Sequence, residues 1–342
     1  FRSAAIHAGE NQSARTLGIP ALNRAIAETW RQGTGVEIDP DAQVTVTTGC
    51  TEGIAATLLG LLNPSDEVVI FEPYYDSYPA LVARVGAVAR FITLRPDETG
   101  RFTYDPDELR AAFGKRTRAI LVNTPHNPTG TVFTREELEF IASLCQEYDA
   151  IAITDEVYEH LVFDGEHHRL QTFPGMEERT ITLSSLGKTF SLTGWKIGWA
   201  IATPALSQAV RAAHQFTTFC SATPFQHGAV AALGAPTSYY DEFVSGYRRK
   251  RDFLCGALTE IGFNVHVPQG TYFILADHAK FGFADDVSFC KHVTEEVGVA
   301  TIPPSAFYAH PERGRQYVRF AFCKTEAVLR EAVARLGRLA SR

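Results

Sequence analysis

The regular alternation of short apolar runs with amphipathic stretches is the feature that most constrains the fold of this chain. The runs "VTVT" (44–47), "EVVIF" (67–71) and "RAILVN" (118–123) are short and rich in β-branched residues, as expected of buried strands. Segments with apolar residues at helical spacing lie between them, for example "TEGIAATLLGLL" (51–62). Strands that alternate with helices in this way predict an α/β fold, in which a mainly parallel sheet has helices on both faces.

Other segments of the first 237 residues follow the same pattern. A helical stretch is expected near 79–87, and two further helices carry their own start signals. Asp105 is the expected N-cap of one, with Pro106 in its first turn and Glu108 three residues on; Thr134 and Glu137 form a capping box for the other. Further strands are predicted at "ARFITL" (89–94), "AIAITDE" (150–156), "TITLSS" (180–185) and "KIGWAIA" (196–202).

The pattern changes near residue 237. A long basic helical segment (240–262) leads to the strand-like run "GTYFILAD", a helix near 286–297, the run "YVRFAFC" and a final helix capped by Thr325. We therefore predict a large domain of residues 20–237. Residues 238–342, together with residues 1–19, are expected to form a smaller α+β domain.

Composition excludes several classes of protein. The net charge of −7 argues against a nucleic-acid partner, since phosphate binding requires a basic face. No apolar run reaches the roughly 18 residues that a membrane span needs, and no segment resembles a signal peptide. The six scattered cysteines and eleven histidines match neither a disulfide framework nor a metal site. We expect a cytoplasmic protein with reduced thiols and no bound metal.

Polar residues gather where four of the predicted strands end. The segments are "TTGCT" (47–51), "NTPHNPTG" (123–130), "TDEVY" (154–158) and "SSLGK" (184–188). In an open α/β sheet, ligands bind in the crevice at the carboxyl ends of the strands. These four segments are therefore expected to form one site.

The chemistry of the strand ends points to one cofactor. Gly49, Cys50 and Thr51 lie where a strand meets a helix N-terminus, which binds anions, but the P-loop and dinucleotide-binding patterns are absent. A buried carboxylate at Asp155 fits a pyridinium nitrogen. Each feature alone is as well explained by a helix cap or a loop acid. Two lysines complete the set: a partly desolvated Lys188 can form a Schiff base, and Lys196 can neutralise a phosphate. Together the three features describe pyridoxal 5′-phosphate.

These residues carry a family resemblance that extends over nearly the whole chain. "SSLGKTFSLTGWKIGW" (184–199) resembles the cofactor-lysine signature of fold-type I, class I pyridoxal-phosphate aminotransferases. "NTPHNPTG" and "TDEVY" resemble its usual companions. The chain is most similar to the subgroup of kynurenine, glutamine, methionine and N-succinyldiaminopimelate aminotransferases. The resemblance implies an aspartate aminotransferase-like fold with a seven-stranded sheet, and a homodimer.

The resemblance also assigns roles to individual residues. Lys188 is expected to hold the Schiff base and to move the substrate proton. Asp155 is expected to pair with the ring nitrogen, and Tyr75 to stack on the ring. Tyr158 and Asn127 match the residues that bind the phenolic oxygen; Asn127 and Arg319 match those that bind the substrate carboxylate. The phosphate is expected to lie among Gly49, Cys50, Thr51, Ser185 and Lys196.

The chain departs from the family pattern at two places. Ser13 stands where the family has a tyrosine that reaches the phosphate of the neighbouring subunit. A serine is too short for this contact, so a water or another residue must replace it. The family's glycine-containing lid segment has no match, and we expect it to be missing from this sequence.

The resemblance implies amino transfer from an L-amino acid to a 2-oxo acid. The donor is expected to be neutral or aromatic, or an N-acylated diamino acid, since no second arginine marks a dicarboxylate specialist. Tyr74, Tyr272 and Phe307 could line an aromatic-tolerant pocket or belong to the core. Two alternatives stay open: a β-lyase that acts on cysteine S-conjugates, and a regulatory protein of this fold with low turnover.

Overall fold

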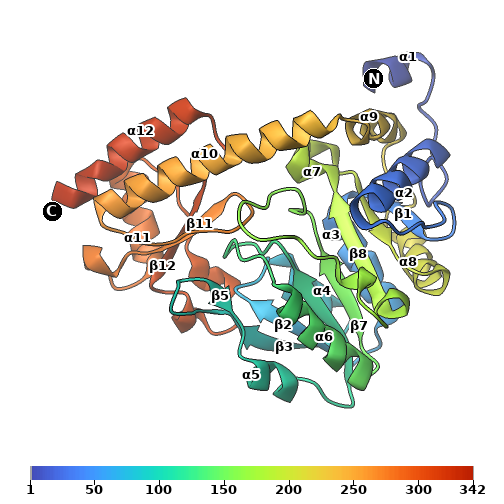
Figure 1. The fold of residues 1–342 in the computed structure, drawn as a ribbon, viewed down its shortest axis with the longest axis horizontal. Coiled ribbons are helices and arrows are strands. Elements are labelled where there is room, and N and C mark those ends of the chain that lie inside the picture. Colours follow the sequence, from blue (N-terminus) through green and yellow to red (C-terminus); the bar gives the residue numbers. More distant parts are fainter. Residues whose placement is uncertain (1, 342) are drawn as a thin grey trace.

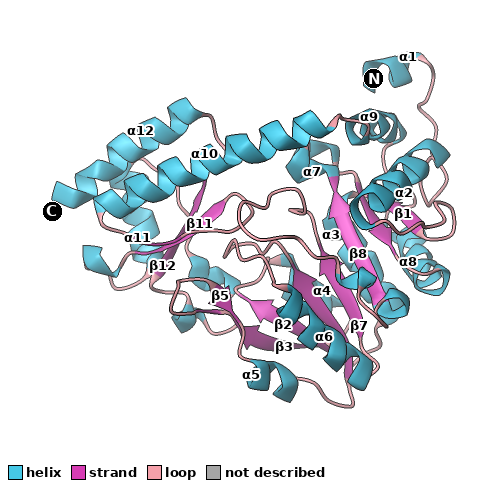
Figure 2. Cartoon of the chain, viewed as in Figure 1, coloured by secondary structure: helices cyan, strands magenta, loops and turns pink. Residues whose placement is uncertain are grey.

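The computed structural model describes residues 2–341, which form two parts joined by the long helix α10 (Thr237–Ile261) (Figure 1). The first part surrounds a sheet of seven strands. The second part contains a small antiparallel sheet that lies beside α10 and the C-terminal helix α12 (Glu326–Leu336) (Figure 2). This arrangement confirms the predicted α/β fold.

The large sheet has the strand order β1-β9-β8-β7-β6-β2-β3. Six of its strands are parallel to one another, and only β9 runs antiparallel to its two neighbours. The mainly parallel seven-stranded sheet is therefore confirmed. Its strands are β1 (Val44–Thr47), β2 (Glu67–Glu72), β3 (Val88–Thr93), β6 (Thr117–Asn123), β7 (Ile151–Asp155), β8 (Thr180–Ser185) and β9 (Gly198–Ile201).

Both faces of this sheet are buried because side chains alternate along each strand. On β2, Val68 and Ile70 belong to one hydrophobic cluster, while Val69 and Phe71 belong to another. The first cluster includes Ile54 and Leu58 of α3, and the second includes Leu138 and Ile141 of α6. The helices of this part are α1 (Arg2–His7), α2 (Pro20–Thr34), α3 (Gly49–Leu61), α4 (Ser77–Arg84), α5 (Pro106–Ala111), α6 (Arg135–Glu147), α7 (Leu186–Thr189), α8 (Pro204–Thr217) and α9 (Thr223–Leu233).

The predicted helix starts are confirmed. The Asp105 carboxylate accepts hydrogen bonds from the backbone N–H groups of Asp107 and Glu108 at the start of α5. Thr134 and Glu137 form the full capping box of α6. Thr325 likewise caps α12. These local signals fix where the helices begin and hence where the preceding loops leave the sheet.

Several predicted boundaries were displaced. The strand expected at 196–202 begins at Gly198, because Lys196 has a left-handed backbone (φ 53°) that no strand residue adopts. The helix expected near 79–87 is α4 (Ser77–Arg84). The helix expected near 286–297 ends at His292 and continues as one π-helical turn.

The C-terminal part contains the antiparallel sheet β10-β11-β12. Residues 1–19 had been grouped with it in the predicted domain division, which remains a prediction. In the structure, the backbone N–H of Val46 in β1 donates to the carbonyl of Leu17, and α1 packs against α9. The remaining elements are β4 (Arg95–Pro96), β5 (Phe102–Thr103), β10 (Asn264–His266), β11 (Phe273–Asp277), α11 (Asp286–His292) and β12 (Tyr317–Ala321).

Two further features concern the whole described chain. Within residues 2–341 no helix combines the length and apolar character needed to cross a membrane. Over the same residues no three His, Cys, Asp or Glu side chains are grouped so that they could hold a metal ion.

Candidate active site

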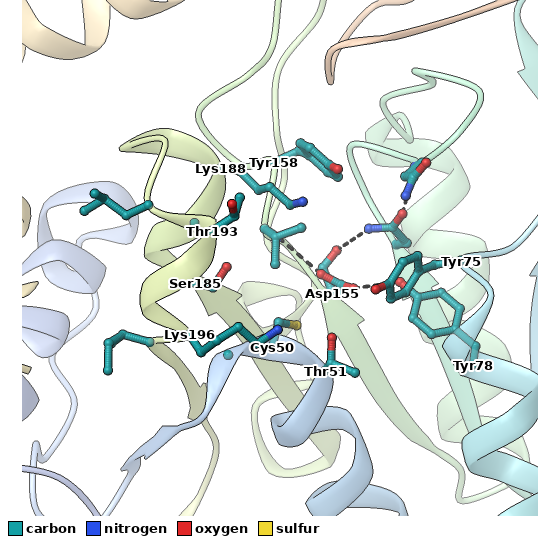
Figure 3. Close-up of a pocket in the computed structure, with 17 residues that line it drawn as sticks. Cys50, Thr51, Tyr75, Tyr78, Asp155, Tyr158, Ser185, Lys188, Thr193 and Lys196 are labelled. Atoms are coloured by element: carbon teal, nitrogen blue, oxygen red, sulfur yellow. Dashed lines mark hydrogen bonds between the residues drawn. The ribbon is translucent and has the colours of Figure 1, made fainter. Parts of the chain in front are cut away.

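A pocket opens at the carboxyl ends of β6, β7 and β8, beside the N-terminus of α3 (Figure 3). Ten of the eleven residues predicted for the site line it. They are Gly49, Cys50, Thr51, Tyr75, Asn127, Asp155, Tyr158, Ser185, Lys188 and Lys196. Figure 3 shows Lys196, Cys50 and Thr51 at one end of the pocket and Lys188 and Tyr158 at the other. The sheet thus brings together residues as far apart in sequence as Gly49 and Lys196.

Asp155 is the last residue of β7 and is 5% exposed. Its carboxylate accepts a hydrogen bond of 2.7 Å from the Tyr78 hydroxyl and one of 3.3 Å from the backbone N–H of Val157. Burial raises the pKa of Asp155, although these hydrogen bonds act in the opposite direction. The Asn123 side-chain amide donates a hydrogen bond of 2.8 Å to the backbone carbonyl oxygen of Asp155. The site therefore contains a fixed, buried carboxyl group that a cationic partner would stabilise in its charged form.

The other end of the pocket is built to receive an anion. Helix α3 begins at Gly49, so the first-turn N–H groups around Cys50 and Thr51 have no partner within the helix. Gly49 has φ 74°, and a Cβ there would lie 3.3 Å from Lys196 Cε. A Cβ at Gly198 would lie 2.7 Å from the Cys50 nitrogen. Glycine at both positions permits the close approach of the β9 segment to the start of α3. This approach places Lys196 beside the free N–H groups of the helix.

Lys188 enters the pocket from the short helix α7, which follows β8 directly. Its amino nitrogen lies 3.1 Å from the hydroxyl oxygen of Tyr272 and 5.5 Å from the ring centre of Tyr158. Burial strongly raises the pKa of Tyr158. The amine therefore lies near the rings of Tyr158 and Tyr272, and the Tyr272 hydroxyl oxygen accepts its hydrogen bond.

Arg319 is the one predicted residue that does not line the pocket itself. It lies on β12, and its Nη1 donates to Asn127 Oδ1 at 3.3 Å. The guanidinium lies 4.4 Å from the ring centre of Phe273 and 4.8 Å from that of Phe307. Burial lowers the pKa of Arg319, yet an arginine stays charged at neutral pH. This planar cation borders the pocket from the C-terminal part and is suited to a carboxylate.

Sequence reasoning missed two side chains that contact the predicted residues, Tyr78 and Asn123. It had considered Tyr272 for a substrate pocket but did not predict its contact with Lys188. Tyr78 follows Tyr75 by three residues in the first turn of α4, so helical spacing could have placed both on one face. Asn123 pairs with Asp155 in the β6–β7 register, which no local pattern predicts. The other lining residues that had not been singled out are Val157, Gly187, Leu192, Thr193 and Ile197.

The aromatic residues considered for a substrate pocket differ in position. Tyr74 packs against Phe91, with ring centres 5.4 Å apart, and its backbone N–H donates to the Phe307 carbonyl. Tyr272 contacts Lys188, and Phe307 contacts Arg319. Tyr74 thus belongs to the packing at the β2 end, while the other two border the predicted site.

Comparison with known proteins yields consistent matches. The family model for aminotransferase class I and II matches residues 2–336. The chain is 46% identical to a probable N-succinyldiaminopimelate aminotransferase of Mycobacterium tuberculosis, over 99% of this chain and 87% of that protein. It is 36% identical to human kynurenine–oxoglutarate transaminase 1, over 93% and 82% of the two chains. The solved structure of an N-succinyldiaminopimelate aminotransferase from Mycobacterium tuberculosis superposes with a TM-score of 0.96, at 46% identity over 99% of this chain and 88% of that one.

Proposed function

The chain belongs to the aminotransferase class I and II family, whose members transfer amino groups with pyridoxal 5′-phosphate, and from this premise we propose the site and the substrates. Lys188 is the amine to which the cofactor attaches. The donor is a neutral or aromatic L-amino acid or an N-acylated diamino acid, and the acceptor is a 2-oxo acid. The observation that carries the assignment is the convergence of Lys188, Asp155 and Lys196 on one pocket.

The residues of the pocket fit the cofactor. The free N–H groups at the start of α3, with Ser185 and Lys196, suit its phosphate. The buried Asp155 carboxyl suits its ring nitrogen, because a pyridinium would supply the cation that the carboxylate lacks. Tyr75 offers an aromatic face for the ring, and Tyr158 and Asn127 offer hydrogen-bonding groups for its phenolic oxygen.

When bound, the cofactor supplies an aldehyde that condenses with amines and a ring that withdraws electrons from the substrate Cα. The residues of this chain do the rest. Arg319, with Asn127, holds the substrate α-carboxylate and so directs the Cα–H bond toward Lys188. Lys188 removes this proton and returns it at the end of the half-reaction. Orientation of this kind can contribute up to about 7–11 kcal/mol of barrier reduction.

The substrate class has two supports. The 46% identity to a probable N-succinyldiaminopimelate aminotransferase over 99% of this chain favours an N-acylated diamino acid. The aromatic residues Phe273 and Phe307 beside Arg319 favour an apolar or extended side chain over a second carboxylate. We further propose that residues 20–237 bind the cofactor and that the C-terminal part of the chain, which carries Arg319, binds the substrate.

We also propose a homodimer in the cytoplasm. Phe216 and Phe219 near the end of α8 are 87% and 48% exposed, which favours burial against a second copy of the chain. Ser13 lies exposed near α9, so the contact that a tyrosine makes in the family must come from another group. All six cysteines are free thiols, which is typical of a reducing compartment.

The experiment that tests the function combines attachment with turnover. Borohydride reduction of the loaded protein, followed by peptide mass spectrometry, is expected to find the cofactor fixed at Lys188. Lys188→Ala is expected to abolish both fixation and amino transfer, whereas the exposed control Lys115→Ala retains both. Fixation at another lysine, or full transfer by Lys188→Ala, would refute the assignment.

A donor panel resolves the substrate. N-succinyldiaminopimelate, kynurenine and methionine are each offered with pyruvate or 2-oxoglutarate, and the oxo acid product is measured. Release of pyruvate and ammonia from a cysteine S-conjugate without an oxo-acid acceptor would instead identify the β-lyase alternative. Failure to exchange the α-hydrogen of any amino acid would identify the low-turnover alternative.

A further inference from the structure

Tyr272 connects the C-terminal part of the chain to the lysine of the pocket. It directly precedes β11, and its backbone carbonyl accepts a hydrogen bond of 3.0 Å from the N–H of Phe322. Its side chain leaves this sheet and brings its hydroxyl oxygen to 3.1 Å from the Lys188 nitrogen. Within residues 2–341, the Tyr272 hydroxyl oxygen is the acceptor of the Lys188 side-chain hydrogen bond.

The backbone that presents Tyr272 is fixed on both sides. Thr271 is fully buried with φ 65°, a left-handed conformation that a β-branched residue rarely adopts. Its N–H donates to the Leu161 carbonyl at 2.9 Å. A Cβ at Gly270 would lie 2.6 Å from that same oxygen, so only glycine permits the approach. Leu161 lies three residues after Tyr158. The hydrogen bond between Thr271 and Leu161 therefore fixes the backbone before Tyr272 relative to the backbone after Tyr158.

The contact between the two phenols fixes the Tyr272 ring. The rings of Tyr158 and Tyr272 meet edge to face with centres 5.3 Å apart. Burial raises the pKa of Tyr158, so that phenol stays protonated. The Lys188 nitrogen donates to the Tyr272 hydroxyl oxygen, which is therefore the acceptor that holds the amine.

We infer that Tyr272 is a positioning residue for Lys188: its hydroxyl oxygen accepts a hydrogen bond from the free amine and holds the nitrogen in place for proton transfer. This inference rests on the proposed role of Lys188. Packing alone does not account for the hydroxyl, because the ring contacts with Tyr158, Tyr247 and Phe273 need only a phenyl ring. The contact would also make the amine sensitive to the position of the C-terminal part.

The first test uses the protein without cofactor. Limited acylation with acetic anhydride is followed at Lys188 by peptide mass spectrometry as a function of pH. Tyr272→Phe removes the oxygen that accepts from the amine. Because an acceptor stabilises the protonated amine, the pH of half-maximal labelling is expected to fall by about one unit. Tyr247→Phe, whose ring stacks on Tyr272 but makes no described contact with Lys188, is the matched control and should label as wild type does.

A fluorinated tyrosine at position 272 makes the test independent of folding effects. It keeps the ring but makes the hydroxyl oxygen a weaker acceptor, so the labelling midpoint is expected to move to lower pH by less than it does in Tyr272→Phe. In the loaded enzyme, Tyr272→Phe is expected to lower kcat about tenfold. It should also increase the α-deuterium isotope effect, with KM changed by no more than about twofold.

Two results would overturn the inference. One is a labelling midpoint of Tyr272→Phe that equals that of wild type or lies above it. The other is an equal shift in Tyr247→Phe. Borohydride fixation in wild type keeps the two proposals separate: absence of the cofactor at Lys188 refutes the proposed function, whereas fixation with unchanged labelling refutes only the role of Tyr272.

Discussion

The Tyr78 hydroxyl donates a 2.7 Å hydrogen bond to the carboxylate of Asp155, although the two residues are 77 positions apart. Tyr78 is 2% exposed, and burial strongly raises its pKa, so the phenol stays protonated and can only donate to the carboxylate. The carboxylate thus keeps one orientation before any ligand arrives. This preorganisation spares the site a rearrangement on cofactor binding.

Tyr78→Phe is expected to weaken cofactor binding roughly tenfold, because a buried hydrogen bond to a charged group contributes about 1.5–3 kcal/mol. The apoprotein should unfold at nearly the wild-type temperature, since the ring remains. Cofactor titration followed by absorbance measures the change. Tyr148→Phe, far from the pocket, serves as the control, and equal affinities of the two variants would contradict the role of Tyr78.

Asp155→Asn tests whether the buried carboxyl group of Asp155 lowers the stability of the apoprotein. Burial raises the folded-state pKa of Asp155 above its ordinary value of 3.8. A group with a raised folded pKa contributes stability below the unfolded pKa and loses it as pH rises through the folded pKa. The melting temperature of apo Asp155→Asn relative to wild type should therefore increase as pH rises above about 4.

Cofactor binding should reverse the order of the melting temperatures of wild type and Asp155→Asn. A pyridinium nitrogen gives the carboxylate a cationic partner, so the loaded wild type is expected to melt above loaded Asp155→Asn at pH 7. Calorimetric scans of both forms across the pH range provide the measurement. A difference that is independent of pH in the apoprotein would show that Asp155 is not strained by its burial.

Local sequence rules predicted the strands, several helix starts and the strand ends that form the pocket, because periodicity, capping and strand-end position are encoded within a few residues. The capping box of Thr134 and Glu137 is one example. The family resemblance, not these rules, added Tyr75, Asn127 and Ser185. Contacts that depend on sheet order or on the packing of the two parts have no local signal. For this reason the contact of Asn123 with the Asp155 backbone and that of Tyr272 with Lys188 were not predicted.

Gly198→Ala is expected to damage the anion-binding end of the pocket. The added Cβ would lie 2.6 Å from the Gly49 carbonyl carbon and 2.7 Å from the Cys50 nitrogen, and both are backbone atoms that cannot turn away. An overpacking cost of about 1–3 kcal/mol predicts a loss of cofactor affinity of roughly 5- to 100-fold. Gly194→Ala, where a Cβ would meet nothing within 4 Å, is the control for a glycine substitution nearby. Similar dissociation constants for the two variants would exclude a tight backbone approach.

Arg169 stabilises the loop that follows Asp155. It donates to Glu156 at 3.0 Å and forms an ion pair with Glu159, and both carboxylates are buried. Burial raises the pKa of Glu159, but Arg169 and neighbouring donors outweigh it and lower the pKa to about 2. Arg169→Met removes the cation from both carboxylates, of which Glu156 keeps a contact of 2.8 Å with His167, and is expected to cost about 3–5 kcal/mol in denaturant unfolding.

The dependence of folding stability on acidic pH gives a second test of the role of Arg169. A lowered folded pKa stabilises the protein above the ordinary value of 4.5, and this contribution is lost as pH falls toward about 2. Arg169→Met should therefore lose less stability over this range than wild type. Arg110→Met, which breaks the exposed pair with Glu147, is expected to change stability by no more than about 1 kcal/mol. Equal costs for the two arginines would contradict the importance of burial.

Arg319→Lys separates substrate binding from cofactor binding. The substitution keeps the positive charge but loses the planar fork that holds a carboxylate with two hydrogen bonds. It also loses the guanidinium that lies over the Phe273 and Phe307 rings. The expected result is a fall in kcat/KM of roughly 10- to 100-fold, which corresponds to about 1.5–3 kcal/mol. Cofactor affinity should not change, because Arg319 does not line the cofactor pocket.

A primary amine that lacks the α-carboxylate provides a sharper test of Arg319. Wild type should use this amine poorly, and Arg319→Lys should reduce kcat/KM for the amine far less than kcat/KM for the amino acid. An equal reduction for both donors would mean that Arg319 acts on the protein rather than on the substrate carboxylate.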